Sequence, residues 1–185
     1  MVRARQPQQT SDQYLVDKEP TMKTLLATLF CMMPLLLSGH VYSADDAADI
    51  VLKISGKDCC NHNGKMEYTR QQLLALPQTS VTTTTPWTKG THVYRGVLLR
   101  SLLDTLDISA KSIKVTAQND YFAAIPREDV EKYPVLLAIE EDGKALTLRN
   151  KGPVWIIYPL SDHPELNIEQ YHSLMVWQVV KLEGM

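Results

Sequence analysis

The sequence contains little glycine and no concentration of positive charge. Only 8 of its 185 residues are glycine, and the formal net charge is -2. Nucleic-acid-binding domains usually carry a basic patch or stripe, and no basic run is present here, so we exclude nucleic acid as a partner. A hydrophobic content of 44% favours a compact globular domain over a disordered or fibrous chain.

The usual patterns of hydrolytic and phosphate-binding sites are also missing from the sequence. There is no glycine-rich phosphate loop, and Ser173 beside His172 has no nucleophile elbow around it. The other histidines that we considered, His62, His92 and His163, show no spacing of the HExxH type. We therefore assign no catalytic residue and no metal ligand.

The N-terminal part of the chain predicts export. From Met22 the sequence reads MKTLLATLFCMMPLLLSGHVYSADD, in which a lysine precedes an apolar run and small residues follow it. This order is typical of a secretory signal peptide. A membrane anchor is the alternative, but Leu25–Leu37 is shorter than the roughly 20 apolar residues that span a bilayer. We predict a signal over residues 22–43, cleaved after Ser43, and a periplasmic protein without stable membrane insertion.

The residues on either side of this signal differ in character. Residues 1–21 are polar and lack hydrophobic periodicity, so we interpret them as an upstream extension produced by a start assigned too early. Residues 44–185 are predicted to form a single domain. Within it, Cys59 and Cys60 are adjacent, and they can form a vicinal disulfide, pair between chains, remain inert thiols or join His62 on a metal. Crowding disfavours the metal, because metal sites usually use four well-spaced ligands.

The periodicity of the domain predicts short strands with a few short helices. Ile50–Ser55 and Met66–Tyr68 should form a hairpin, and Thr69 should cap a helix that Pro77 ends. Leucines at helical spacing follow Gly96. The remaining expected elements are a threonine-rich strand from 81, strands Lys114–Ala117 and Tyr121–Ile125 around an Asn119-Asp120 turn, a helical turn REDVEKY, a hairpin of Val135–Glu140 with Ala145–Arg149, and strands Val154–Tyr158 and Val176–Leu182. Such a mixture belongs to the α+β class, with mixed or antiparallel sheets.

Four ordered motifs carry a resemblance to a known family. They are YRGVLLRSLLDTL, NDYFAAIPREDV, YPVLLAIEEDGKALTLRNKGPVWIIYP and a final strand ending VVKLEG. Together they resemble the molybdopterin-binding domain of the sulfite oxidase family over residues 50–183. The resemblance implies the fold of that domain.

The same resemblance exposes three departures from the family pattern. The cysteine that holds molybdenum in catalytic members falls near Thr85, and a hydroxyl is a poor substitute for a thiolate. Trp155 stands where the family has an arginine suited to the cofactor's phosphate. The segment YHSLMVWQVVK lacks the basic residue expected at a second phosphate contact.

These departures imply a pocket for a pterin without metal. By resemblance, the pterin would stack on Trp87 or Trp155 and form hydrogen bonds with Thr85, Asn119 and Asp120, and its guanidine-like edge would donate to the Asp120 carboxylate. The resemblance also places Tyr121 and Arg149 in this site.

Two functions from different classes follow from the resemblance. Small exported members of the fold that lack the cysteine resemble periplasmic pterin-binding proteins that regulate membrane-bound cyclic-di-GMP enzymes, which implies a ligand-sensing partner without chemistry of its own. The alternative is a molybdenum-cofactor oxidoreductase of the sulfite oxidase type, with molybdopterin as cofactor and Cys59 or Cys60 as the metal ligand. Those cysteines precede the strand that carries the ligand in the family.

Overall fold

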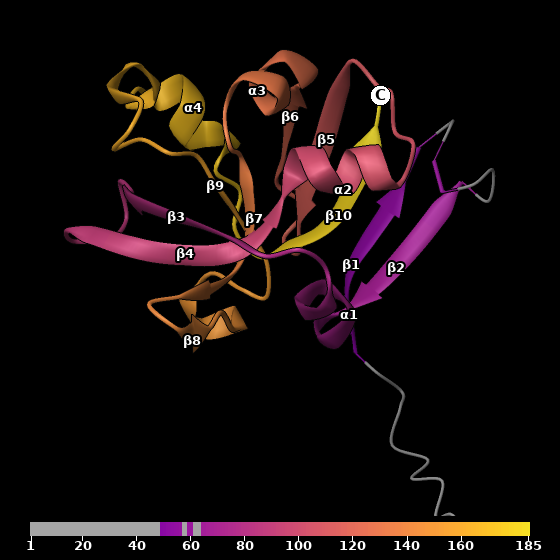
Figure 1. Cartoon of the computed structure of the whole chain (residues 1–185), viewed down its shortest axis with the longest axis horizontal. Coiled ribbons are helices and arrows are strands. Elements are labelled where there is room, and N and C mark those ends of the chain that lie inside the picture. Colours follow the sequence, from indigo (N-terminus) through magenta and orange to yellow (C-terminus); the bar gives the residue numbers. More distant parts are fainter. Residues whose placement is uncertain (1–48, 57–58, 61–63) are drawn as a thin grey trace, which may run out of the picture. The chain divides into compact units, whose positions relative to one another are not determined.

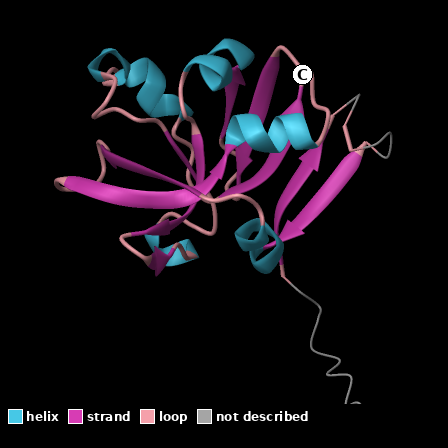
Figure 2. Ribbon diagram, in the orientation of Figure 1, coloured by secondary structure: helices cyan, strands magenta, loops and turns pink. Residues whose placement is uncertain are grey.

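Two five-stranded sheets organise the described part of the chain (Figures 1 and 2). The computed structural model describes residues 49–56, 59–60 and 64–185. The predicted extension over residues 1–21, the predicted signal over 22–43 and His62 lie outside these described residues. No helix within the described ranges is long and apolar enough to cross a membrane.

The first sheet joins strands from both ends of the domain. Its order is β2-β1-β10-β5-β6, and β1 pairs in parallel with β10 while the other neighbours are antiparallel. The strands are β1 (Ile50–Ser55), β2 (Lys65–Thr69), β5 (Ser112–Ala117), β6 (Phe122–Pro126) and β10 (Val179–Gly184).

The second sheet is antiparallel and carries a hairpin that leads to the candidate site. Its order is β3-β4-β7-β8, and β9 also pairs with β7, opposite β4. The strands are β3 (Thr79–Thr84), β4 (Thr91–Leu98), β7 (Leu136–Glu141), β8 (Lys144–Ala145) and β9 (Trp155–Ile157). One mixed and one antiparallel sheet with short helices confirm the predicted α+β class.

The helices are short and lie around the sheets. They are α1 (Arg70–Ala75), α2 (Leu99–Thr105), α3 (Arg127–Lys132) and α4 (Glu169–Leu174), with 3-10 turns η1 (Leu148–Asn150) and η2 (Pro164–Leu166). Thr69 caps α1 as predicted: its hydroxyl accepts from the Gln72 amide, and the Gln72 side chain accepts from the Thr69 amide. This reciprocal pair satisfies two groups that a helix start leaves unbonded.

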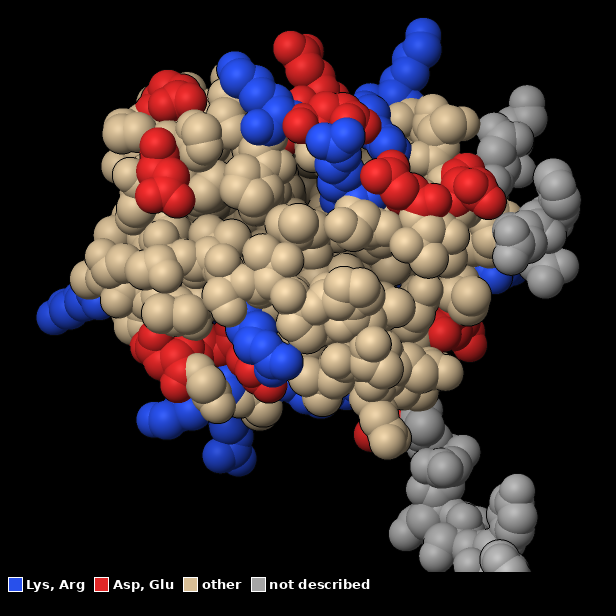
Figure 3. All heavy atoms as spheres, in the orientation of Figure 1, with Lys and Arg blue, Asp and Glu red and all other residues tan. Residues whose placement is uncertain are grey.

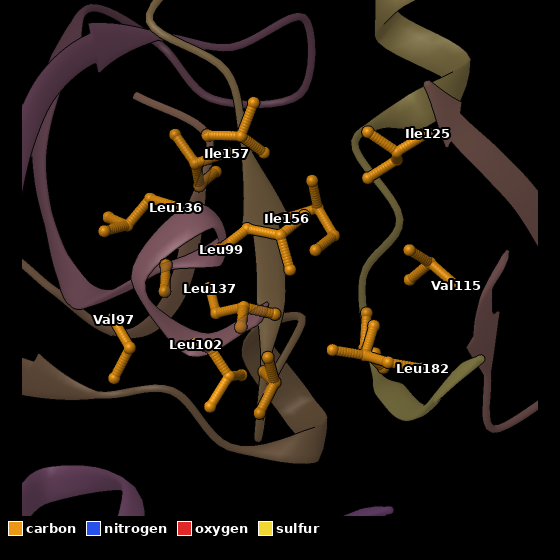
Figure 4. Packing of buried hydrophobic residues seen from close by; sticks show 14 of the residues in the cluster. Val97, Leu99, Leu102, Val115, Ile125, Leu136, Leu137, Ile156, Ile157 and Leu182 are labelled. Carbon is orange, nitrogen blue, oxygen red and sulfur yellow. The ribbon is translucent and has the colours of Figure 1, made fainter. Parts of the chain in front are cut away.

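The hydrophobic core lies between the two sheets (Figure 4). Side chains from β5, β6 and β10, such as Val115, Ile125 and Leu182, face Ile156 of β9 and Leu137 of β7. All five are almost completely buried. The leucines of α2 close this core, since Leu99, Leu102 and Leu103 are buried as their helical spacing predicts.

Charged side chains flank an uncharged band on one face of the molecule. Figure 3 shows this band across the face that carries β3 and β4, with Lys, Arg, Asp and Glu above it over α2 and α3 and a second charged group below it near β8. Arg127 of α3 contacts Asp104 of α2 at 2.9 Å and Glu131 at 2.7 Å. The first pair joins the two helices and the second lies within α3, and such surface pairs each contribute little to stability.

The structure corrects four predicted details. Residues Thr91–Leu98 form β4, a strand that the sequence analysis did not predict, and Leu98 belongs to it rather than to the helix. The second arm of the later hairpin is only β8, because residues 148–150 turn into η1. The final strand begins at Val179 rather than Val176. Helix α4 was missed altogether.

Cys59 and Cys60 form a vicinal disulfide, one of the alternatives left open by the sequence. Both side chains are buried, and the Cys60 amide donates to the Leu106 carbonyl at the end of α2. The pair therefore joins the β1–β2 connection to α2.

Candidate functional site

A pocket of about 680 Å³ lies between the tip of the β3–β4 hairpin and α4. Three segments line it: the hairpin tip, the β5–β6 turn, and the stretch from residue 167 to residue 177. The lining residues are Pro86, Trp87, Ala117, Asn119, Tyr121, Asn167, Ile168, Glu169, His172, Ser173, Met175, Val176 and Trp177. A volume of this size is within the range of small-molecule sites.

A tight turn places Trp87 at the pocket. The Thr88 amide donates to the Thr85 carbonyl, which closes a four-residue turn with Pro86 and Trp87 at its centre. Proline favours the second position of such turns because its ring fixes φ. The proline and tryptophan that end the threonine-rich strand thus reverse the chain and present an indole.

Two indoles dominate the pocket wall. The rings of Trp87 and Trp177 meet edge to face, with centroids 4.9 Å apart and an interplanar angle of 79°. The side chains are 38% and 37% exposed, so each retains accessible ring surface. Aromatic surfaces of this kind suit a flat heteroaromatic ligand, which can stack on or pack against them.

Polar groups face the same space from α4 and from the β5–β6 turn. His172 Nε2 lies 2.9 Å from Asn167 Oδ1, so this nitrogen is the donor. The Tyr121 hydroxyl donates to the Ser173 carbonyl at 3.0 Å and thereby ties the turn to α4. Glu169, in the first turn of α4, adds a carboxylate.

The described pocket lining contains no lysine or arginine. Among the described residues that form it, Glu169 is the sole Asp, Glu, Lys or Arg. An anionic group such as a phosphate would meet no arginine or lysine here to accept hydrogen bonds from. The lining instead favours an uncharged ligand with hydrogen-bond donors on one edge.

Thr85 lies behind this wall rather than in it. Its side chain is 6% exposed, and its hydroxyl oxygen lies 2.7 Å from Thr88 Oγ1 and 3.3 Å from the Trp87 amide nitrogen. The hydroxyl is therefore engaged within the turn and is absent from the pocket lining. The ligand hydrogen bond expected from Thr85 is replaced by a contact that supports Trp87.

Trp155 is in the core and offers no ring face to a ligand. The indole is 0% exposed, its Nε1 donates to the Met175 carbonyl at 3.1 Å, and its ring meets Tyr94 edge to face at 5.4 Å. The Lys151 ammonium lies 5.3 Å from the ring centroid. Stacking by Trp155 needs an accessible face, so we correct that expectation and retain Trp87.

The remaining predicted residues are divided by the structure. Asn119 and Tyr121 line the pocket, whereas Asp120, which adopts a left-handed backbone conformation with φ of 65°, does not. Arg149 is an exposed residue of η1 and is also absent from the lining.

Sequence reasoning missed one whole wall of the pocket. Residues 167–177 supply Glu169, His172 and Trp177, yet their sequence NIEQYHSLMVW has no clear apolar periodicity. Helix α4 buries none of its six residues completely, so the pattern on which helix prediction depends is absent. The concentration of aromatic and amide side chains was the available signal.

Comparison with known proteins places this chain in a family. The family described as oxidoreductase molybdopterin binding domain matches residues 39–161. The chain belongs to that family. No curated protein matches it.

A solved structure agrees with this assignment. The crystal structure of the sulfane dehydrogenase SoxCD from Paracoccus pantotrophus resembles this family member with a TM-score of 0.57 and 21% identity. The match covers 74% of this chain and 38% of that one. At this identity it shows a shared fold, which is the sulfite oxidase-like molybdopterin-binding fold.

The described site does not fit a complete molybdopterin with its metal. The position that the resemblance gives to the metal-binding cysteine is occupied by the engaged Thr85, and Cys59 and Cys60 are bonded to each other. Within the described ranges no group of three His, Cys, Asp or Glu side chains could hold a metal ion. The absence of lysine and arginine from the lining also leaves a phosphate without a partner.

Proposed function

We propose that this protein binds a pterin without metal and performs no redox chemistry with it. The observation that carries the proposal is the composition of the pocket: two accessible indoles, two side-chain amides, one imidazole and a single carboxylate. A bare pterin is flat and presents neighbouring N–H donors, so it can use each of these groups.

The pocket supports a different carboxylate contact from the one the sequence suggests. Glu169 is in the lining and Asp120 is not. An ionised carboxylate accepts two parallel hydrogen bonds from a guanidine-like edge, and such bonds are stronger than those between neutral groups. We therefore assign the edge of the pterin to Glu169 and its ring face to Trp87 and Trp177.

The location of this wall supports a ligand other than the family's usual cofactor. The family match ends at residue 161, and the wall that carries Glu169 and Trp177 comes after it. In this proposal the wall that selects the ligand lies outside the matched part of the chain, and the fold is retained.

The proposal includes a periplasmic location and a signalling partner. The predicted signal over residues 22–43 supports export, and the resemblance to pterin-binding regulators supports a membrane-bound cyclic-di-GMP enzyme as the partner. In this proposal the protein reports pterin occupancy to the periplasmic domain of that enzyme.

A molybdopterin-dependent oxidoreductase is the second candidate function. The family match over residues 39–161 favours it, because the family is named for an oxidoreductase domain. It requires a metal ligand and a phosphate contact that the described pocket lining does not supply.

Analysis of the copurifying ligand tests the two candidates. The full chain is expressed in a molybdenum-replete host, purified from the periplasm, and measured for metal by elemental analysis and for pterin by mass spectrometry. We expect a pterin without molybdenum. Near-stoichiometric molybdenum would overturn the proposal in favour of the oxidoreductase, and the absence of any pterin together with no binding of added pterins would overturn both.

A further inference from the structure

A line of hydroxyl groups runs from the hairpin tip to a carboxylate on another strand. The Trp87 amide nitrogen lies 3.3 Å from Thr85 Oγ1, and Thr85 Oγ1 lies 2.7 Å from Thr88 Oγ1. Thr88 Oγ1 lies 3.5 Å from the Tyr94 hydroxyl, which donates to Glu141 Oε1 at 3.0 Å. The line thus starts at the pocket and ends on β7.

The chemistry of these groups fixes the direction of every hydrogen bond. A hydroxyl has one proton to donate, and Tyr94 gives its proton to Glu141, so Tyr94 must accept from Thr88. Thr88 has then used its proton and accepts from Thr85, while Thr85 accepts from the Trp87 amide. All donors point towards the carboxylate, and hydrogen bonds aligned in this way polarise and strengthen one another.

Burial protects the middle of the line from water. Tyr94 is 0% exposed, and its ring packs edge to face against Trp155. Desolvation raises the pKa of Tyr94 well above its ordinary value, so the phenol remains a neutral donor. Of the four side chains, none belongs to the pocket lining.

We infer that Thr85, Thr88, Tyr94 and Glu141 form a positioning device that holds Trp87 against the pocket. The turn between the two strands presents Trp87 through its backbone, and the only side-chain bond to that backbone amide among the described residues comes from Thr85. Loss of one hydroxyl lets the turn shift, and the indole shifts with it. The ligand-binding consequence of this inference rests on the proposed pterin function.

Two matched pairs of substitutions separate this role from general stability. Thr88→Val removes the hydroxyl at nearly constant shape, and Thr88→Ser keeps the hydroxyl. Tyr94→Phe removes one buried phenol that donates to a carboxylate, and Tyr158→Phe does the same elsewhere, because the Tyr158 hydroxyl donates to Asp129 at 3.2 Å. Neither Thr88, Tyr94 nor Tyr158 lines the pocket.

The first readout needs no ligand. The paired indoles of Trp87 and Trp177 should give a near-ultraviolet circular dichroism signal that depends on their mutual orientation. We expect this signal to change in Thr88→Val and Tyr94→Phe and to be preserved in Thr88→Ser and Tyr158→Phe. An unchanged signal in both chain-breaking variants would overturn the positioning role whatever the protein binds.

The second readout is pterin affinity by calorimetric titration of the full chain. We expect pterin affinity to fall about threefold to tenfold in Thr88→Val and Tyr94→Phe, which corresponds to the net free energy of one hydrogen bond. Thr88→Ser should bind with nearly wild-type affinity. A change equal to that in Tyr158→Phe would make the effect one of stability and would contradict the inference. If wild type binds no pterin, the proposed function fails while the dichroism result still decides the positioning role.

Discussion

His92 has a hydrogen-bond acceptor at each ring nitrogen. Nδ1 lies 2.7 Å from Asp142 Oδ2, and Nε2 lies 3.0 Å from the Lys89 carbonyl. A neutral imidazole has one N–H, so only the imidazolium satisfies both acceptors. The hydrogen bond to Asp142, followed by that to Lys89, raises the pKa of His92 above its usual value of 6.5, and Glu141 at 3.7 Å adds to the effect.

The raised pKa of His92 predicts a contribution to stability that decreases as the pH rises. A group whose folded-state pKa is raised stabilises fully below the unfolded-state pKa and loses that contribution as pH rises through the folded-state pKa. We expect His92→Asn to lower the melting temperature more at about pH 5.5 than at about pH 9, measured by thermal denaturation. Asp142→Asn should reduce the dependence. An equal loss at both pH values would show that the charge of His92 is irrelevant.

The second prediction at this scale compares two carboxylates near the pocket. Glu169→Gln should weaken pterin binding about tenfold, because an amide offers one acceptor where the carboxylate offers two charged ones. Asp120→Asn is the matched control, since Asp120 is absent from the lining, and should leave affinity nearly unchanged. Calorimetric titration measures both. A larger loss of affinity in Asp120→Asn than in Glu169→Gln would assign the contact with the pterin edge to Asp120 instead.

At the residue scale, the sequence predicted which residues lie near the pocket better than it predicted which side chains face it. Trp87, Asn119 and Tyr121 line the pocket, and Thr85 and Trp155 lie directly behind its wall. A motif resemblance gives a position along the strand, but the exposure of a side chain depends on what packs over it. The Trp155 indole contacts the rings of Trp87 and Tyr94 and donates to the Met175 carbonyl, and the sequence pattern did not indicate these contacts.

Gly96 is required by the contact between strands β4 and β7. The pairing shifts register between Arg95 and Gly96, and a Cβ at Gly96 would overlap the Leu137 carbonyl oxygen and lie 2.8 Å from Ala138 Cα. Gly96→Ala should therefore lower the free energy of unfolding by about 3 kcal/mol or more, because backbone atoms cannot move aside as a flexible side chain can. Chemical denaturation measures this loss.

Gly56→Ala is the control for this prediction. A Cβ at Gly56 would meet its nearest neighbour, Cys59 Cβ, at 3.5 Å, an ordinary contact distance. We expect a change smaller than about 1 kcal/mol, as at sites without a specific conflict. Similar losses in the two variants would mean that the close approach at Gly96 relaxes easily.

The elements that could be predicted are those with a local signal. A local sequence pattern, such as alternation, helical spacing, a capping residue or a turn sequence, predicts each of these elements. They are the β1–β2 pair, the capped α1, the buried face of α2 and the β5–β6 turn. β4 and α4 have no such pattern, because the pairing of β4 with β7 shifts register beside Gly96 and α4 lies half exposed over a pocket. Their structures depend on tertiary contacts, and no short stretch of sequence encodes those.

For the whole molecule, ligand binding should raise the melting temperature. A ligand that binds only the folded state, at about 100 times its dissociation constant, adds about 2.7 kcal/mol. We expect a clear rise in melting temperature with an uncharged pterin and a smaller one with its phosphate ester, since Glu169 is the one charged side chain in the described lining. An equal or larger rise with the ester would indicate a phosphate site and favour the molybdopterin reading.

The place of β10 in the first sheet sets an order of assembly. β10 lies between β1 and β5, yet it is made after every other strand. Until residues 179–184 leave the ribosome, the β1–β2 pair and the β5–β6 pair have no strand to join them. Most of the domain must therefore be synthesised before this sheet can close.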